Sequence, residues 1–205
     1  MGGDGTGTAP FENVGIDPRN GDFVLASVPG GINEGDGMGD GVNPSTTDSD
    51  YIDSVFFIGP APVDSPDPFP QTITTSGVEF DFPLADGIGT GYNYILGDRG
   101  GGEGAQPMLV GGGTYAAGVG MHSSTGITYD LATLRTDFGD AAVGTFVTYW
   151  GADACGTADI NLYAILSNDS GIVSQRVFRA VANAGEYVEI PIPADADYLT
   201  LAVGS

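Results

Sequence analysis

Alternating apolar and polar positions dominate the chain from residue 51 onward and predict a series of short strands. Ile127, Tyr129 and Leu131 alternate with polar residues, and Val78, Phe80 and Phe82 do the same in an earlier run. A period of two is typical of strands that bury one face. The runs expected to form strands span residues 51–59, 72–83, 126–135, 143–153, 158–169, 174–182, 186–193 and 197–204.

Turn-forming residues separate these runs and favour an all-β fold. The chain has 35 Gly and 13 Pro, which are unfavourable inside helices and common in tight turns. Strands at spacings of about ten residues are typical of a sandwich or a barrel, and of the two we expect an antiparallel β-sandwich. Residues 130–135, with the sequence DLATLR, are expected to close as a single helical turn.

The first 50 residues differ from the rest and predict a separate segment. They are rich in Gly and Asp and have one apolar island, DFVLASV at residues 22–28. We therefore expect an acidic, glycine-rich arm over residues 1–50, with one strand, followed by a sandwich over residues 51–205.

The charge of the chain is strongly one-sided and excludes one class of partner. The sequence has 27 acidic residues against five arginines and no lysine, for a formal net charge of −22. Such a chain repels phosphate backbones and lacks the basic stripe of nucleic-acid-binding proteins. No apolar run approaches the roughly 20 residues of a membrane helix, so we expect neither nucleic-acid binding nor membrane insertion.

Residues 114–203 resemble the NPCBM family of carbohydrate-binding modules. The similarity lies in four segments, in the family's order: GVGMHSSTGITYDL at 118–131, TFVTYWGAD at 145–153, DINLYAILSNDS at 159–170 and GEYVEIPIPADADYLTLAV at 185–203. The resemblance implies a galactose-binding-like jelly roll with no catalytic activity, which binds a glycan or polysaccharide in a secreted or cell-surface protein.

The closing segment departs from the family's pattern, which continues past the equivalent of LTLAV into a further strand. We therefore expect either that the protein continues past residue 205, or that the last strand position is filled by residues 22–28 or by a neighbouring subunit, since an unfilled sheet edge can add a strand. An open edge supports an alternative function: a structural, self-associating subunit of an extracellular filament or surface layer. Catalysis ranks behind both functions.

His122 is the single histidine, and three interpretations of it stay open. A catalytic base needs a nucleophile or an orienting partner, and the sequence offers no such pairing. A zinc site has no second histidine to use. Hydrogen bonding within the framework is the first interpretation, contact with a sugar is the second and catalysis is the third.

Sugar binding usually needs an aromatic face flanked by polar side chains. Tyr92, Tyr94, Asp98 and Arg99 lie together in a glycine-rich stretch and are the candidate sugar-binding residues, together with His122. Trp150 is expected in the core instead, because it shares a face with Phe146 and Thr148 in an alternating strand.

An acidic loop at residues 32–43, INEGDGMGDGVN, has part of the spacing of a twelve-residue calcium loop. Glu34, Asp36, Asp40 and Asn43 fall at ligand positions three, five, nine and twelve, and Gly37 falls at the required sixth. Ile32 at the first position and the missing Glu at the twelfth argue against calcium. Both interpretations stay open: a Ca²⁺ site, or a solvated acidic loop.

Overall fold

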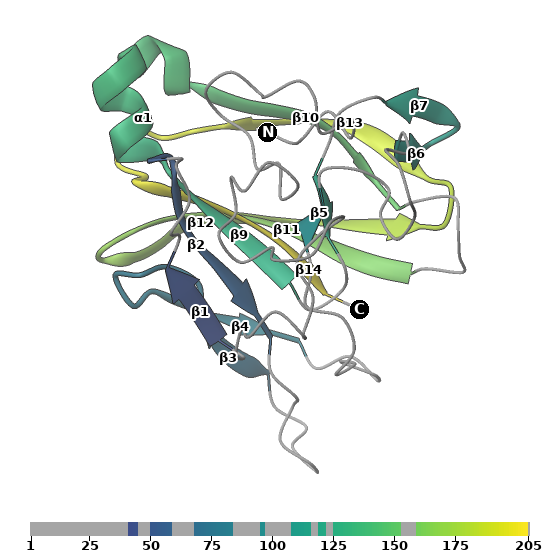
Figure 1. The fold of residues 1–205 in the computed structure, drawn as a ribbon, viewed down its shortest axis with the longest axis horizontal. Helices are drawn as coiled ribbons and strands as arrows, with labels where there is room; N and C mark the ends of the chain where they lie inside the picture. The colour runs from purple at the N-terminus through teal and green to yellow at the C-terminus, as the bar shows by residue number, and fades with distance from the viewer. Residues whose placement is uncertain are drawn as a thin grey trace.

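A computed structural model describes the residues 41–44, 50–58, 68–83, 95–96, 108–115, 119–121, 125–152 and 159–204. Within these residues the protein is an antiparallel β-sandwich with one short α-helix (Figure 1). The all-β sandwich expected from the alternation is confirmed. The candidate sugar-binding residues Tyr92, Tyr94, Asp98, Arg99 and His122 lie outside the described residues, as do Glu34, Asp36, Asp40 and the island at 22–28.

The main sheet has six antiparallel strands in the order β1-β2-β9-β14-β11-β12. The strands are β1 (Gly41–Pro44), β2 (Ile52–Phe57), β9 (Thr125–Asp130), β11 (Asp159–Asn168), β12 (Gly171–Val181) and β14 (Tyr198–Gly204). Strand β1 comes from the stretch expected to be the arm, and it pairs with β2. Strand β12 forms one edge of the sheet as far as the described residues show.

A two-stranded ribbon covers one face of this sheet. It consists of β10 (Thr145–Gly151) and β13 (Gly185–Pro191), and Figure 1 shows it as a separate layer. Its alternate residues Trp150, Val188 and Ile190 join Leu162 and Leu199 of the sheet in one buried core. The prediction that Trp150 lies in the core is therefore confirmed, with 9% of its surface exposed.

A hairpin of β3 (Phe69–Thr72) and β4 (Glu79–Phe82) covers the opposite face. Phe80 and Phe82 pack there with Tyr163 of β11 in edge and tilted ring contacts. Their burial, together with that of Val78, confirms the predicted alternation of these three residues. The sheet is thus covered on both faces, and the fold has three layers.

The β-rich run at residues 72–83 forms parts of two strands in the structure. Residues 74–77 form a turn between β3 and β4, because Gly77 adopts a φ of +91° and the Thr74 hydroxyl accepts a hydrogen bond from the Val78 N–H. The β-rich run therefore supplies the end of β3, the turn and the whole of β4.

The helix is longer than the expected single turn. Helix α1 spans Leu131–Phe138 and is followed by a 3₁₀ helix over Asp140–Val143. The Asp130 carboxylate caps its first turn by accepting from the Thr133 N–H at 2.8 Å, and Gly139, with a φ of +82°, ends it. These two caps set the length of the helix at eight residues, whereas the sequence led us to expect a single turn.

Two short strand pairs complete the described fold. Strand β5 (Ile95–Leu96) pairs with β8 (Gly120–Met121), and β6 (Met108–Val110) pairs with β7 (Gly113–Tyr115). The β6–β7 turn uses Gly111 and Gly112, both with positive φ, as a two-residue hairpin turn requires. Figure 1 shows this hairpin beside the end of the β10–β13 ribbon.

Candidate functional site

The predicted sugar-binding residues flank a described strand pair. Strand β5 lies between Tyr94 and Asp98 in the sequence, and β8 immediately precedes His122. Ile95 pairs with Met121, so the two stretches that supply the candidates meet through these strands.

Three of the four predicted calcium ligands lie outside the described residues. Only Asn43 falls in a described element, β1, and that strand is described by its backbone pairing. In the ranges that the structure does describe, no group of three or more His, Cys, Asp or Glu side chains is placed to hold a metal ion. The calcium loop therefore stays a prediction.

Three exposed tyrosines gather on the outer face of the β10–β13 ribbon. Because side chains alternate along a strand, Tyr149 points outward where its neighbour Trp150 points into the core. Tyr149 and Tyr187 are direct partners in the antiparallel register. Cross-strand partners on one face have Cβ atoms about 5 Å apart, so these two side chains begin close together on the outer face.

The β6–β7 hairpin supplies the third ring. Tyr115 stacks on Tyr149 with ring centroids 5.3 Å apart and an angle of 24° between the planes. We call Tyr115, Tyr149 and Tyr187 the tyrosine surface. Their exposed fractions are 36%, 38% and 64%, so each ring keeps a substantial area open to solvent.

Glycines allow the β6–β7 hairpin to pack closely against the β10–β13 ribbon. A Cβ at Gly151 would meet the Val110 side chain at 2.6 Å, and one at Gly185 would meet it at 2.9 Å. A Cβ at Gly111 would overlap the Tyr149 hydroxyl. Close approach of the backbone at these positions is what permits Tyr115 to reach Tyr149.

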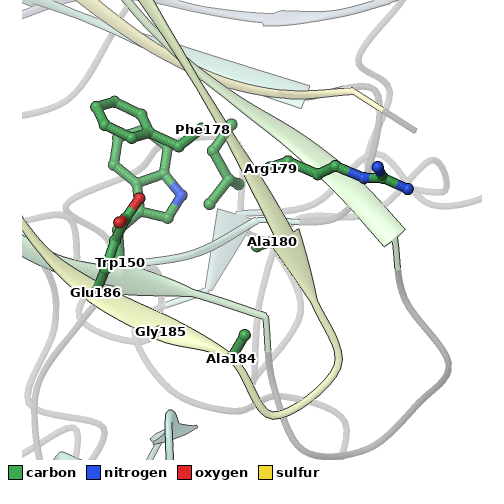
Figure 2. A pocket seen from close by; sticks show the side chains of 8 residues that line it. Trp150, Phe178, Arg179, Ala180, Ala184, Gly185 and Glu186 are labelled. Carbon is green, nitrogen blue, oxygen red and sulfur yellow. The ribbon is translucent and has the colours of Figure 1, made fainter.

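A small hollow lies on the inner side of the same ribbon, between the ribbon and strands β11 and β12. Its lining includes Trp150, Phe178, Ala180, Ala184 and Glu186 (Figure 2). We call it the Trp150 hollow. Its volume of about 140 Å³ is enough for several waters.

The Trp150 hollow combines aromatic rings with one carboxylate. The Trp150 and Phe178 rings are tilted by 37° with centroids 5.6 Å apart. Trp150 and Glu186 are register partners, so their side chains emerge from the same face of the ribbon. Figure 2 shows the charged end of Arg179 directed away from the hollow and the Trp150 indole nitrogen on the side toward Ala180.

Only part of the arrangement of these residues can be predicted from the sequence. The alternation of side chains along a strand places Trp150 and Val188 inward and therefore places Tyr149 and Tyr187 outward. This much follows from the sequence alone. The pairing of Tyr149 with Tyr187 depends on the register between two strands 38 residues apart along the chain. Tyr115 lies on a separate hairpin, and no local pattern placed it against Tyr149.

Comparisons with known proteins give a structural likeness only. No family model matches the chain, and no curated protein matches it. Solved structures similar to it include carbohydrate-binding modules of the CBM51 type from Clostridium perfringens. One is CBM51 from GH95 in complex with methyl-galactose, with 27% sequence identity over 57% of this chain and 78% of that chain, and a TM-score of 0.41.

Two further structures come from Clostridium perfringens ZmpB. CBM51-2 in complex with GlcNAc, with INT domains, is 16% identical over 73% of this chain and 36% of that chain, with a TM-score of 0.39. The M60 catalytic domain with CBM51-1 and CBM51-2 is 16% identical over 80% of this chain, with a TM-score of 0.39. The match spans 17% of that longer chain. The NPCBM family itself stays a prediction.

Within the described ranges, no helix has the length and apolar character needed to cross a bilayer.

Proposed function

We propose that this chain is a non-catalytic carbohydrate-binding module of a secreted or cell-surface protein, and that the tyrosine surface is its sugar-binding face. The observation that carries the proposal is the stacked pair of Tyr115 and Tyr149 beside the exposed ring of Tyr187. Exposed aromatic rings bind the apolar faces of pyranose rings, and aromatic contacts of this kind contribute about 0.5–1.5 kcal/mol each.

The surroundings of the tyrosine surface favour a neutral sugar. Glu189 lies on the same outward face of β13, opposite Val147, and its carboxylate accepts hydrogen bonds from hydroxyl groups. The net charge of −22 disfavours sulfated or uronic-acid polymers, because like charges repel. A neutral polysaccharide or glycan fits both features.

Two expectations from the sequence accompany this proposal. The loop at residues 92–99 with His122 is a second candidate for sugar contact, and the loop at 32–43 is a candidate for Ca²⁺. The tyrosine surface is a separate candidate, because its three tyrosines lie on the described strands β7, β10 and β13.

The alternative of a self-associating subunit depends on the edge strand β12. This strand has 11 residues, exposes Ile172, Val177 and Val181, and has no partner strand on its outer side among the described residues. A sheet edge without a partner can add a strand from another chain. Light scattering after size exclusion separates the two functions. A monomer at micromolar concentration supports the binding module, and filaments or large assemblies support the alternative.

A glycan array followed by calorimetry tests the proposal. We expect a neutral glycan to bind the wild-type chain and Tyr187→Ala to weaken that binding about 2- to 10-fold, which is the loss of one stacking contact. The matched control is Val177→Ala, which removes an exposed apolar side chain from β12 and is expected to bind normally. Equal affinities of Tyr187→Ala and wild type, or no glycan bound at all, contradict the proposal.

A further inference from the structure

The Trp150 hollow is a separate place from the tyrosine surface. Trp150 and Glu186 face inward from the ribbon, whereas Tyr149 and Tyr187, which precede and follow them in the sequence, face outward. A ligand stacked on the tyrosines lies on the other side of the ribbon from the hollow. Each place therefore has its own chemistry and its own occupant.

Size limits what the hollow takes. Its volume of about 140 Å³ is below the range of about 300–1,000 Å³ that holds a drug-sized ligand. A substituent fits where a whole sugar chain does not. The occupant is therefore a small group that projects from a larger molecule.

The lining offers three kinds of contact to such a group. Glu186 provides a carboxylate that accepts hydrogen bonds, and the Trp150 indole N–H is a donor. Phe178 and Ala180 provide apolar wall. A group that satisfies all three has one donor, one acceptor and a small apolar part.

An acetamido group has these three parts. Its N–H pairs with a carboxylate, its carbonyl accepts from an N–H donor, and its methyl group packs against aromatic and alanine side chains. An ammonium group has donors only and leaves the indole N–H without a partner. A hydroxyl group has no methyl for the apolar wall, and a carboxylate or sulfate is repelled by Glu186.

We propose that the Trp150 hollow is a second binding site, which takes the acetamido group of an N-acetylated amino sugar. The inference rests on the proposed function in that the group is carried by a sugar. It does not depend on the tyrosine surface, because no residue of the hollow belongs to that surface.

Intrinsic fluorescence provides a direct test, because Trp150 is the single tryptophan of the chain. The probes are N-acetylglucosamine, glucose and glucosamine, each titrated into the full chain. We expect N-acetylglucosamine to change the Trp150 emission with saturation, and glucose and glucosamine to bind at least about tenfold more weakly. Equal responses to the three sugars, or no response to N-acetylglucosamine, overturn the proposal.

Variants locate the response in the hollow. Glu186→Ala removes the acceptor and is expected to weaken N-acetylglucosamine binding about tenfold or more, because a hydrogen bond to a charged group is lost. Glu79→Ala is the matched control, since it removes an exposed carboxylate from β4, in the hairpin on the opposite face of the sheet. If both variants titrate like the wild type, the hollow is not the site.

The two proposals fail separately. Tyr187→Ala is expected to weaken glycan binding on the array and to leave the Trp150 titration unchanged. A Trp150 response without a role for Tyr187 supports the hollow and contradicts the tyrosine surface. Far-ultraviolet circular dichroism shows whether the Glu186→Ala chain is folded, and the loss of its Trp150 response counts only if it is. Phe178→Leu is a second variant of the hollow, and we expect it to weaken the same response.

Discussion

Tyr149 and Trp150 are neighbours in the sequence and have opposite environments. Trp150 is buried in the core between ribbon and sheet, while Tyr149 carries the stacked ring of Tyr115 on the outside. The pleat of strand β10 produces this division, because successive side chains leave opposite faces. A shift of one residue in the register of β10 would bury the tyrosine and expose the tryptophan.

Gly126 has to be small because the Phe56 ring lies against it. It faces Phe56 across the β2–β9 pair, and a Cβ at this position would overlap the fully buried Phe56 ring. We expect Gly126→Ala to lower the free energy of unfolding by about 1–3 kcal/mol, since overpacking forces the ring to move. Urea denaturation followed by Trp150 fluorescence measures the loss.

Gly144→Ala is the control for this prediction. Gly144 has a right-handed backbone with a φ of −88°, and the nearest atom to an added Cβ is 4.0 Å away. We expect its stability to stay within about 0.5 kcal/mol of the wild type. A Gly126→Ala variant as stable as Gly144→Ala would show that the Phe56 ring does not lie over residue 126.

Tyr129 makes stability depend on alkaline pH. Burial raises the pKa of the Tyr129 phenol above its ordinary value of 10.0, because the phenolate is disfavoured in the core. In the unfolded chain the phenol ionises near pH 10, so its contribution to stability is complete below that pH and is lost as the pH rises further.

Urea midpoints at about pH 8 and about pH 11 test this dependence. We expect the wild type to lose stability between them and Tyr129→Phe to lose less, since phenylalanine does not ionise. The pKa of Tyr163 is also raised by burial, so part of the loss stays in the variant. An identical loss in Tyr129→Phe would rule out a buried neutral phenol at this position.

Alternation predicted which residues lie inward, but it did not predict the candidate site. Trp150, Val78, Phe80 and Phe82 are buried as their patterns indicate, because burial follows from the period of a strand. The tyrosine surface depends on contacts between β7, β10 and β13, whose pairing is set by tertiary packing. The sites that sequence did propose, at 92–99, His122 and 34–43, are left as predictions.

The Arg135 side chain joins helix α1 to the connection between two strands. The Arg135 guanidinium donates to the Ala196 carbonyl at 2.6 Å and to the Pro193 carbonyl at 2.9 Å, both in the connection between β13 and β14. The expectation of one helical turn missed this arrangement, because a contact across about 60 residues leaves no local pattern. Its Asp130 cap, in contrast, is a residue type typical of helix starts.

Arg135→Ala is expected to lower the free energy of unfolding by about 2–3 kcal/mol, because two carbonyls lose a charged donor. Arg135→Lys restores part of the loss, as an ammonium group replaces the two-pronged guanidinium. Thermal unfolding by circular dichroism compares these variants with Arg176→Ala, which removes an exposed arginine from β12. Equal melting temperatures for Arg135→Ala and Arg176→Ala would contradict the tether.

The whole molecule combines a three-layer fold with a large negative charge. The sheet buries both faces, against the β10–β13 ribbon on one side and the β3–β4 hairpin on the other (Figure 1). The ribbon thereby becomes an outer layer with a face of its own, and it supports both candidate sites. The net charge of −22 opposes this compact state by self-repulsion.

Salt is therefore expected to stabilise the protein. Screening shortens the reach of charge interactions from about 10 Å at 0.1 M to about 3 Å at 1 M ionic strength. We expect the melting temperature to rise by several degrees when KCl is raised over this range, and to rise equally with NaCl. A melting temperature that falls with salt would mean that attractive charge pairs outweigh the repulsion.

The central claim is that sugar binds on the outer face of the β10–β13 ribbon, and nuclear magnetic resonance tests it most directly. Titration of the isotope-labelled chain with a glycan that it binds is predicted to shift the amide signals of Tyr115, Tyr149 and Tyr187 together. Signals of the β3–β4 hairpin on the opposite side are predicted to stay in place. Shifts that gather at residues 92–99 and His122, with the three tyrosines unchanged, would contradict the account.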